Sequence, residues 1–442
     1  MRRALIKALH YGRLHGWSAL IRKIRIRFGD LGDFLSVHPK PRLVGGRDTI
    51  LVVSHEASRT GAPILALNLV QRLMERYNVV VLLLGAGELR ANFYRTGAMV
   101  TTAGHLRIAP ALARFLVNRL CRNVRFKFAL VNSVESAVIL PALRKNSVRT
   151  VTLIHEFASY TRPRRVFEDA LKWSDELVFS TKLTWESALH EYPDLTGRSA
   201  HIVPQGRCVV PPRNESMEQY NNERIHISRL MRSKASENDS VIILGAGSVI
   251  LRKGVDKFIE CAAHVVRAHS GRKCRFIWIG NGFSPDTDIG YSVYLADQIH
   301  RAELQGYVSF IEETAAIEAA YEEADLFLLS SRLDPLPNVA IDALGMGVPV
   351  LCFDKATGIA DFLNENGLGD YCIAEYLDSS DMAKKILALV ASPILRSQIG
   401  DRSREASMAY FDMASYVSKM VGIAQFDNML KKTSEVKITS YS

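Results

Sequence analysis

The sequence predicts an α/β protein built from two doubly wound, parallel-sheet domains. Short apolar runs rich in β-branched residues alternate with amphipathic segments along most of the 442 residues. The runs are apolar throughout, as expected for parallel strands that are covered by helices on both faces. A polar stretch interrupts the alternation once, and the pattern then resumes. We therefore expect two domains of similar size that face one another across a cleft.

The first domain is predicted over residues 48–206. Helical patterns such as APILALNLVQRLMER and PALARFLVNRLC separate its apolar runs, and each strand–helix–strand unit requires a right-handed crossover. The strands expected in this domain cover residues 49–56, 78–85, 127–133, 149–157, 175–182 and 200–206.

The second domain is predicted over residues 240–400. The polar residues 207–239 before it contain paired prolines, so we expect a linker with one helix. Residues 401–442 are expected to form helices that pack back toward the first domain, followed by a tail. The strands expected in the second domain cover residues 240–247, 273–282, 307–313, 324–331 and 348–354.

The N-terminal segment, residues 1–47, is basic and amphipathic. Eight Arg or Lys residues precede the first acid, Asp30, and apolar residues recur among them at helical spacings. Such a helix can lie on an anionic membrane, so residues 1–30 are a candidate membrane-binding segment. A helix docked on the protein body, or an unstructured tail, would give the same pattern. Much of the net charge of +10 lies in this segment.

Composition excludes several classes of protein. The chain has neither an apolar run long enough to span a membrane nor the continuous apolar core of a secretory signal, so we expect a cytoplasmic location. Its six cysteines lack C-x-x-C spacing and fit reduced thiols better than disulfides or a zinc site. We find no zinc finger, RNA-recognition signature or helix-turn-helix pattern and expect no nucleic-acid partner.

A basic turn follows the first strand of the second domain. Arg252 and Lys253 stand there before Gly254, in the sequence GAGSVILRKG. Adjacent cations at a strand-to-helix turn suit a diphosphate, with a point charge from lysine and forked hydrogen bonds from arginine. A solvated basic turn is the alternative interpretation.

The stretch DPLPNVAIDALGMG follows a later strand of the same domain. Pro335 and Pro337 fix the loop, and we expect a helix from about Asn338 to Gly345 or Gly347. The first N–H groups of that helix have no intrahelical partner and form an anion site. Carboxylates cannot hold phosphate, but they accept hydrogen bonds from hydroxyls. A diphosphate between two sets of sugar hydroxyls, which is a nucleotide-sugar, suits the whole stretch.

The same residues resemble a known family. DPLPNVAIDALGMGVPVLCFD is similar to the donor-site segment of retaining glycosyltransferases of family 4, which have the GT-B fold. Their E-x(7)-E motif corresponds here to Asp334-x(7)-Asp342. GAGSVILRKGVDKFI, WIGNG and IVPQG resemble further motifs of that family, in the same order. The resemblance runs from about residue 50 to residue 400.

The resemblance implies roles for single residues. Lys253 and Arg252 would hold the donor diphosphate together with the amides around Pro337, Asn338 and Val339. Asp334 would hold hydroxyls of the transferred sugar, and Asp342 the nucleotide ribose. The sequence departs from the family in three places: both acids are Asp instead of Glu, and Ser248 stands where an arginine is usual. We expect Arg252 to substitute for that arginine.

The first domain contributes the acceptor side of the expected site. Gly61 and Ala62 open a helix after the first strand, and in the family this loop touches the donor phosphates. His55, Glu56 and Arg59 lie nearby. Hydrogen bonding at the strand end is the alternative role of His55 and Glu56. At the end of a later strand stand His155 and Glu156. In the family a histidine at this strand end lines the reaction site, so His155 joins Asp334, Arg252 and Lys253 as candidate catalytic residues.

The expected reaction is a retaining glycosyl transfer to a glycan or lipid-linked acceptor, in bacterial surface polysaccharide or lipopolysaccharide synthesis. Two cations can do the work of a divalent ion, so we predict no required metal and no other cofactor. An epimerase or hydrolase acting on nucleotide-sugars on the same fold, and a non-catalytic glycosyltransferase-like binding partner, are the alternatives. A dinucleotide-dependent dehydrogenase fits least, because GAGSVILRKG lacks the G-x-G-x-x-G spacing.

Overall fold

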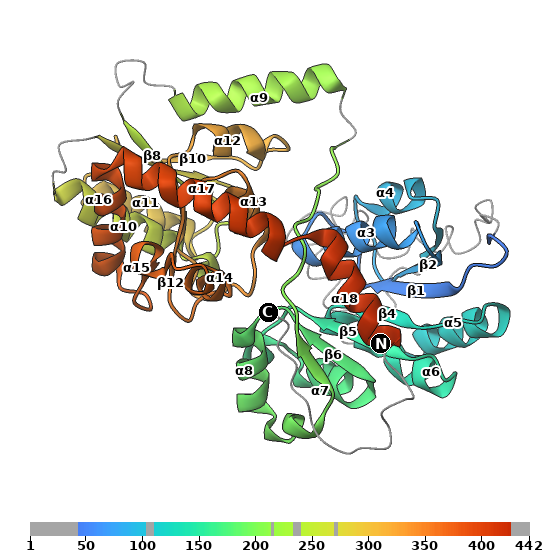
Figure 1. Cartoon of the computed structure of the whole chain (residues 1–442). Coiled ribbons are helices and arrows are strands. Elements are labelled where there is room, and N and C mark those ends of the chain that lie inside the picture. Colours follow the sequence, from blue (N-terminus) through green and yellow to red (C-terminus); the bar gives the residue numbers. More distant parts are fainter. Residues whose placement is uncertain (1–42, 103–109, 214–215, 233–239, 269–272, 426–442) are drawn as a thin grey trace, which may run out of the picture. The chain divides into compact units, whose positions relative to one another are not determined.

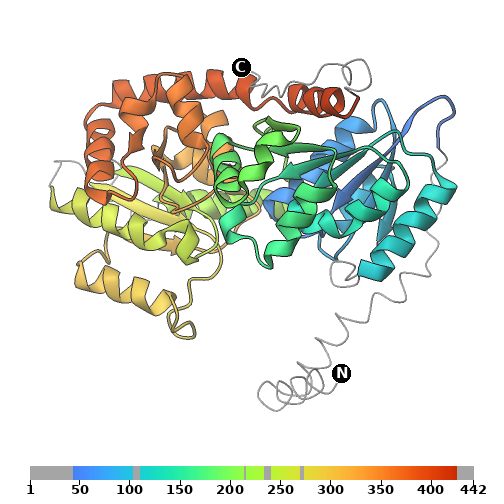
Figure 2. The ribbon, with the colours of Figure 1, turned by 90° about the horizontal axis from the view of Figure 1, so that it is seen from below.

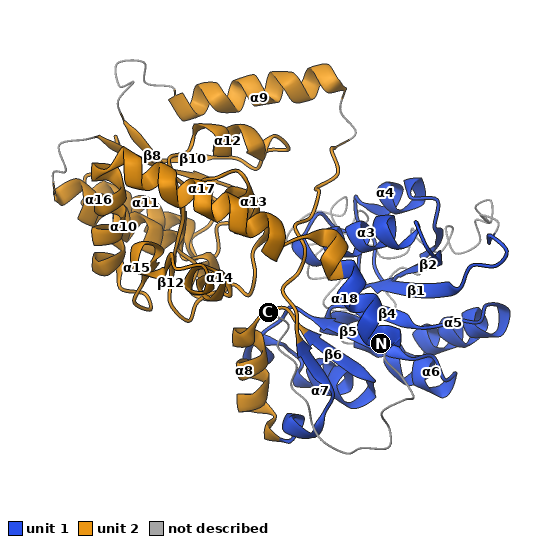
Figure 3. Ribbon diagram, in the orientation of Figure 1, with its two compact units in different colours: residues 1–178, 194–201, 417–439 blue, residues 179–193, 202–416, 440–442 orange. Residues whose placement is uncertain are grey.

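The computed structural model describes residues 43–102, 110–213, 216–232, 240–268 and 273–425. The candidate membrane-binding segment, residues 1–30, lies outside these ranges. The described residues divide into two compact units (Figure 1, Figure 3). The first unit runs to Val178 and also takes Asp194–His201 and the chain from Val417 on. The second unit takes Phe179–Pro193 and Ile202–Tyr416.

The first sheet has seven strands in the order β3-β2-β1-β4-β5-β6-β7. Wherever the strand register is known, the pairing is parallel, and the central strands are buried along their whole length because helices cover both faces. Its strands are β1 (Thr49–Ser54), β2 (Asn78–Leu83), β3 (Met99–Thr102), β4 (Ala129–Asn132), β5 (Thr150–Ile154), β6 (Glu176–Phe179) and β7 (Ala200–Ile202). The helices between these strands are α3 (Gly61–Leu73), α4 (Arg90–Arg95), α5 (Pro110–Asn123), α6 (Leu140–Lys145), α7 (Arg164–Trp173) and α8 (Lys182–Glu191).

The second sheet has six parallel strands in the order β10-β9-β8-β11-β12-β13. Its strands are β8 (Val241–Ala246), β9 (Cys274–Ile279), β10 (Val308–Ile311), β11 (Leu326–Leu329), β12 (Val350–Phe353) and β13 (Ile373–Ala374). Its helices are α9 (Met217–Arg232), α10 (Val255–Arg267), α11 (Ser292–Arg301), α12 (Ile317–Glu323), α13 (Asn338–Gly345), α14 (Ile359–Glu365), α15 (Gly369–Cys372), α16 (Ser379–Ala391) and α17 (Pro393–Tyr410). A last helix, α18 (Met413–Gln425), ends the described chain, and its residues from Val417 on group with the first unit.

The predicted class is confirmed, because both units carry parallel sheets with helices on their faces. Each of the eleven expected strands has a counterpart, and the expected linker contains one helix, α9. Two strands were missed. β3 is half-exposed along its whole length and contains two threonines, and β13 is two residues long, so neither gives a buried apolar run.

Two further observations concern composition. All six cysteines are free thiols, and five of them are buried. Among the residues that the structure describes, no helix combines the length and the apolar character needed to cross a membrane.

The order and register of the strands determine which loops lie next to one another. In the first sheet Ser54 at the end of β1 pairs with Asn132 at the end of β4, which pairs in turn with Leu153 near the end of β5. In the second sheet β8 pairs with β11. The loops that follow these strands emerge at the carboxyl edge of each sheet, where open α/β sheets bind ligands.

Candidate active site

The basic turn after β8 packs directly against the loop that follows β11. Gly254 has a φ of +68°, and a Cβ atom there would lie 2.0 Å from the carbonyl oxygen of Ser330, so no other residue fits. The N–H of Arg332 donates to the carbonyl of Arg252 at 2.9 Å. This close approach brings the two expected anion-binding elements together.

Asp334 receives both cations of the turn. Nη1 of Arg252 lies 3.0 Å from Oδ1, and Nζ of Lys253 donates to Oδ2. Ser331 Oγ donates to Oδ2 at 3.3 Å. Burial by itself would raise the pKa of Asp334, but Lys253 and Arg252 outweigh it and hold that pKa below its ordinary value. The carboxylate is therefore ionised at neutral pH, 8% exposed, and bound to the two cations expected to hold a diphosphate.

Helix α13 begins at Asn338, as predicted, with Pro337 before it. The carbonyl of Pro337 accepts hydrogen bonds from Ala340 and Ile341. No acceptor among the described residues faces the N–H groups of Asn338 and Val339. Asp334 N donates to the carbonyl of Ala356 at 2.8 Å, which fixes the loop before the helix. The predicted helix start is thus present, and the loop before it is held by a backbone hydrogen bond.

Asp342 on α13 pairs with an arginine that the sequence did not single out. Arg207 Nε lies 3.0 Å from its Oδ1, and Gln205 Nε2 donates to the side chain of Asn338 at 2.6 Å. Burial raises the pKa of Asp342 to about 6 in spite of Arg207. The IVPQG segment that ends the first Rossmann-like sheet is therefore part of the environment of α13.

The raised pKa of Asp342 has a measurable effect on stability. Between the ordinary carboxyl pKa of about 4 and pH 6, the folded protein keeps a proton that the unfolded chain releases, so stability falls as pH rises through this window. We expect Asp342→Asn to raise the free energy of unfolding by about 2 kcal/mol at pH 7.5 and to leave it almost unchanged at pH 4.

Urea unfolding at both pH values tests this expectation. Asp297→Asn is the matched control, because Asp297 is 53% exposed in a surface pair with Arg301. If Asp342→Asn showed the same pH dependence as the native chain, the assignment of a raised pKa to Asp342 would be wrong.

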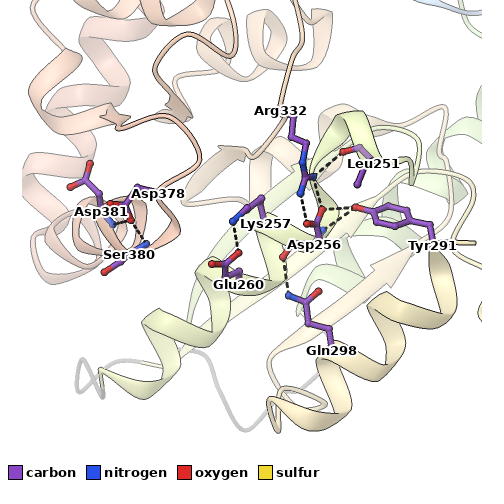
Figure 4. Close-up of polar contacts among 10 residues, drawn as sticks. All are labelled: Leu251, Asp256, Lys257, Glu260, Tyr291, Gln298, Arg332, Asp378, Ser380 and Asp381. Carbon is purple, nitrogen blue, oxygen red and sulfur yellow. Dashed lines mark hydrogen bonds and ion pairs between the residues drawn. The ribbon is translucent and has the colours of Figure 1, made fainter.

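A second charged network holds the basic turn in place (Figure 4). Arg332 binds Asp256 with two hydrogen bonds of 2.7 and 2.6 Å, and its Nη1 also donates to the carbonyl of Leu251 at 3.0 Å. Tyr291 Oη donates to Oδ1 of Asp256 at 2.7 Å, and Gln298 Nε2 donates to the Asp256 carbonyl. Burial would raise the pKa of Asp256, but Arg332 and Tyr291 outweigh it and lower that pKa. This network joins the start of α10, the basic turn and the loop before Asp334.

In the first unit, His155 is held in one tautomer. Asn132 Nδ2 donates to the carbonyl of Ala62 at 2.7 Å, so its Oδ1 accepts from Nε2 of His155 at 2.9 Å. Burial lowers the pKa of His155 to about 4, and the ring is neutral at physiological pH. Its buried Nδ1 has no hydrogen-bond partner within the described chain. His155 therefore presents an acceptor nitrogen and is not a protonated acid.

Glu156 is a structural acceptor for its surroundings. It accepts from Ser133 Oγ, from the N–H of His155 at 3.0 Å and from the N–H of Val134 at 3.4 Å. Ser133 has a φ of +75°, a strained value for serine that these bonds maintain. Burial raises the pKa of Glu156. The two members of the predicted pair therefore differ: His155 has a buried acceptor nitrogen without a hydrogen-bond partner among the described residues, and Glu156 is bound by its neighbours.

The remaining candidates of the first unit lie around the start of α3. Gly61 and Ala62 open this helix as predicted, and Asn132 joins Ala62 to His155. His55 Nε2 lies 3.8 Å from Oε1 of Glu56, which also accepts from Ser58 Oγ. Arg59 is half-buried in the loop before α3.

The sequence contains a D-x-D triplet, a pattern found at metal sites, at Asp286–Asp288. The Asp288 carboxylate accepts from the N–H of Gly290 and from the N–H and hydroxyl of Ser292, so it caps the start of α11. Within the described ranges no cluster of three or more His, Cys, Asp or Glu side chains is arranged to hold a metal ion.

Two Rossmann-like sheets, each with its candidate residues beyond the carboxyl ends of its strands, define the GT-B fold class. Residues 227–406, less than half of the chain, match the family described as Glycosyl transferases group 1. HepE of Anabaena, solved in complex with UDP and glucose, matches 85% of this chain and 99% of its own, with a TM-score of 0.66 and 16% identity.

Sequence relatives match the chain only in part. An uncharacterized glycosyltransferase of Haemophilus influenzae is 23% identical over 181 residues, which are 41% of this chain and 48% of that protein. The lipopolysaccharide core biosynthesis glycosyltransferase LpsE of Rhizobium meliloti is 26% identical over 182 residues, 39% of this chain and 46% of that protein. The chain spans about half the length of these curated relatives.

Proposed function

We propose that the protein is a retaining, metal-independent glycosyltransferase that moves a hexose or deoxyhexose from a nucleoside-diphosphate sugar to a glycan or lipid-linked acceptor. The observation that carries this proposal is the convergence of Lys253 and Arg252 on Asp334, directly before the open N-terminus of α13. The match to glycosyl transferases group 1 and the fold shared with HepE, which was solved in complex with UDP and glucose, support it.

The chemistry follows from the charges at this turn. When the bond between the anomeric carbon and the leaving phosphate oxygen breaks, negative charge grows on the diphosphate. Lys253, Arg252 and the N–H groups of Asn338 and Val339 stabilise that charge where it develops. The acceptor hydroxyl attacks on the leaving-group face and its proton passes to the departing phosphate, so the sugar keeps its anomeric configuration. Asp334 orients the sugar through its hydroxyls without forming a bond to it.

Other residues hold the rest of the substrates. Asp342, beside Arg207, binds the nucleotide ribose through the carboxylate oxygen that Arg207 leaves open. In this proposal His155 lines the reaction site near the transferred sugar, and Gly61 and Ala62 approach the donor phosphates. His55, Glu56, Arg59 and Glu156 border the acceptor. The relative LpsE supports a role in lipopolysaccharide or surface polysaccharide synthesis. We place this activity at the cytoplasmic face of a bacterial inner membrane as part of the proposal.

Two measurements test the proposal. A thermal-shift screen of UDP-, GDP- and dTDP-sugars identifies the donor, and the consumption of that donor is then followed with and without a glycan acceptor, in chelator. Consumption that requires the acceptor, with an unchanged anomeric configuration in the product, is the expected result. Consumption without acceptor indicates the epimerase or hydrolase, and binding without turnover indicates the non-catalytic partner.

The Arg332–Asp256 network gives a prediction for a positioning residue. We expect Arg332→Gln to weaken the binding of the nucleoside diphosphate about tenfold, because the turn that carries Arg252 and Lys253 loses its clamp, and to destabilise the chain by about 2 kcal/mol. Arg332→Lys should recover part of the affinity through one hydrogen bond to Asp256. Arg301→Gln, at a 79% exposed side chain, is the control. Unchanged diphosphate affinity in Arg332→Gln, measured well below its unfolding temperature, would limit Arg332 to a structural role.

A further inference from the structure

Apart from the basic N-terminal segment, the positive charge of the chain is concentrated in one region of the first unit. Residues 89–167 contain fourteen Arg or Lys residues and two acids, Glu135 and Glu156. The net charge of this region, +12, exceeds the +10 of the whole chain, so all other residues together carry −2. Glu156 is already engaged by three hydrogen-bond donors. No part of the proposed transfer chemistry uses this excess.

Helix α5 presents part of this charge to solvent. It buries Ala113, Leu116 and Val117 against the unit. On its other side Phe115 is 56% exposed and Leu112 is 42% exposed, although both are large apolar side chains. The exposed arginines of this helix are Arg114, Arg119 and Arg122.

Two of these arginines share one stripe with the exposed phenylalanine. Positions 115, 119 and 122 follow the i, i+4, i+7 spacing, so Phe115, Arg119 and Arg122 lie above one another on the helix surface. Arg119 and Arg122 form no ion pair within the part of the chain that the structure describes. Both cations are therefore available to an external anion.

Helix α6 lies beside α5 in the first unit (Figure 1, Figure 2). Its last residues extend the basic area. Asn146, directly after α6, donates to Asn118 in the middle of α5 at 2.7 Å, so the end of α6 lies against α5. Arg144 and Lys145 are exposed at this end. The α5 surface is defined here as these two residues together with Leu112, Arg114, Phe115, Arg119 and Arg122.

We propose that the α5 surface docks on an anionic lipid bilayer. A soluble polyanion would neutralise the arginines but leave Phe115 and Leu112 in water. A lipid headgroup layer accepts both, because cations pair with its phosphates while apolar side chains enter the acyl boundary. The inference concerns where the protein sits and holds whether or not the proposed sugar transfer is correct. It adds a second contact, on the folded unit, to the candidate segment at residues 1–30.

The arginines and Phe115 should each contribute enough to membrane binding for their contributions to be measured separately. Each arginine near an anionic surface raises the partition coefficient about fivefold. Insertion of Phe115 contributes roughly a further tenfold. Screening at molar salt should remove most of the arginine contribution, because the Debye length falls to about 3 Å.

Co-sedimentation of the full chain with vesicles tests the proposal. Vesicles of phosphatidylcholine with phosphatidylglycerol are compared with vesicles of phosphatidylcholine alone, and heparin serves as a soluble polyanion. We expect Arg119→Gln/Arg122→Gln to lower binding to the anionic vesicles about 25-fold. Phe115→Ser should lower it about tenfold and leave heparin binding unchanged.

The matched control lies on α9 of the second unit. Ile225→Ser/Arg229→Gln removes a 51% exposed apolar side chain and an exposed arginine from a helix of similar length, and should bind vesicles like the native chain. All variants keep residues 1–30, and equal thermal unfolding shows that they are folded. Native-level vesicle binding by both α5 variants overturns the proposal. Binding to heparin without binding to vesicles overturns it in favour of a soluble polyanion.

Discussion

Lys253→Met is expected to lower the rate of sugar transfer by roughly 10²- to 10³-fold, the loss found when one preorganised donor to a developing oxyanion is removed. Lys253 is 14% exposed, and its ammonium group lies at the carboxylate of Asp334. When the donor bond breaks, this is the buried cation closest to the leaving phosphate in the proposed mechanism. Methionine keeps the length of the side chain, so packing against Gly247 is retained while the charge is lost.

The same substitution should weaken the binding of UDP or of the preferred nucleoside diphosphate, because Arg252 alone remains beside Asp334. Lys257→Met is the matched control. Lys257 is one turn further along, 20% exposed, and pairs with Glu260 outside the proposed site (Figure 4). For both variants, calorimetry measures the binding of the nucleoside diphosphate and initial rates measure the transfer. Thermal unfolding checks that both variants are folded. Near-native transfer by Lys253→Met would refute the proposed site.

The meeting of Lys253 and Asp334 was predictable because of a general property of parallel sheets. Both residues follow predicted strands, and the carboxyl ends of parallel strands share one edge. What the sequence does not contain is the strand order, in which β8 and β11 are neighbours. The sequence also does not show why residue 254 must be glycine. The structure does, because the backbone of Ser330 approaches Gly254 too closely for a Cβ atom.

Two arginine–aspartate pairs near the candidate site were not predictable from the local sequence. Arg207 lies 135 residues before Asp342, and Arg332 crosses 76 residues to reach Asp256. Asn132 and Ser133 do carry a signal in the sequence, because Asn132 is the last residue of the buried strand β4 and Ser133 follows it directly. Polar residues at this position are candidates for a site, as His155 and Glu156 are. The sequence suggested that the carboxylates of Asp334 and Asp342 are unpaired. In the structure both are paired with arginine or lysine, which makes their removal informative.

Asp334→Asn is expected to separate diphosphate binding from sugar transfer. In the native chain the carboxylate lies against Arg252 and Lys253 and repels an incoming diphosphate. Asparagine has nearly the same shape but no charge, so both cations become available. We expect UDP, or the preferred nucleoside diphosphate, to bind as tightly as in the native chain or up to about tenfold more tightly. The rate of transfer should fall roughly 10²-fold, because the sugar hydroxyls lose their charged acceptor.

The opposite effects on diphosphate binding and on the rate of transfer distinguish two roles for Asp334. As an orienting group for the sugar, it is needed for transfer and dispensable for diphosphate binding. As a mere counter-ion that positions Lys253, its loss would weaken diphosphate binding as much as Lys253→Met does. Asp401→Asn, in a surface pair at 63% exposure, controls for the loss of one negative charge. Calorimetric titration with the diphosphate, combined with initial rates, assigns the role, because only the orienting role predicts tight binding together with slow transfer.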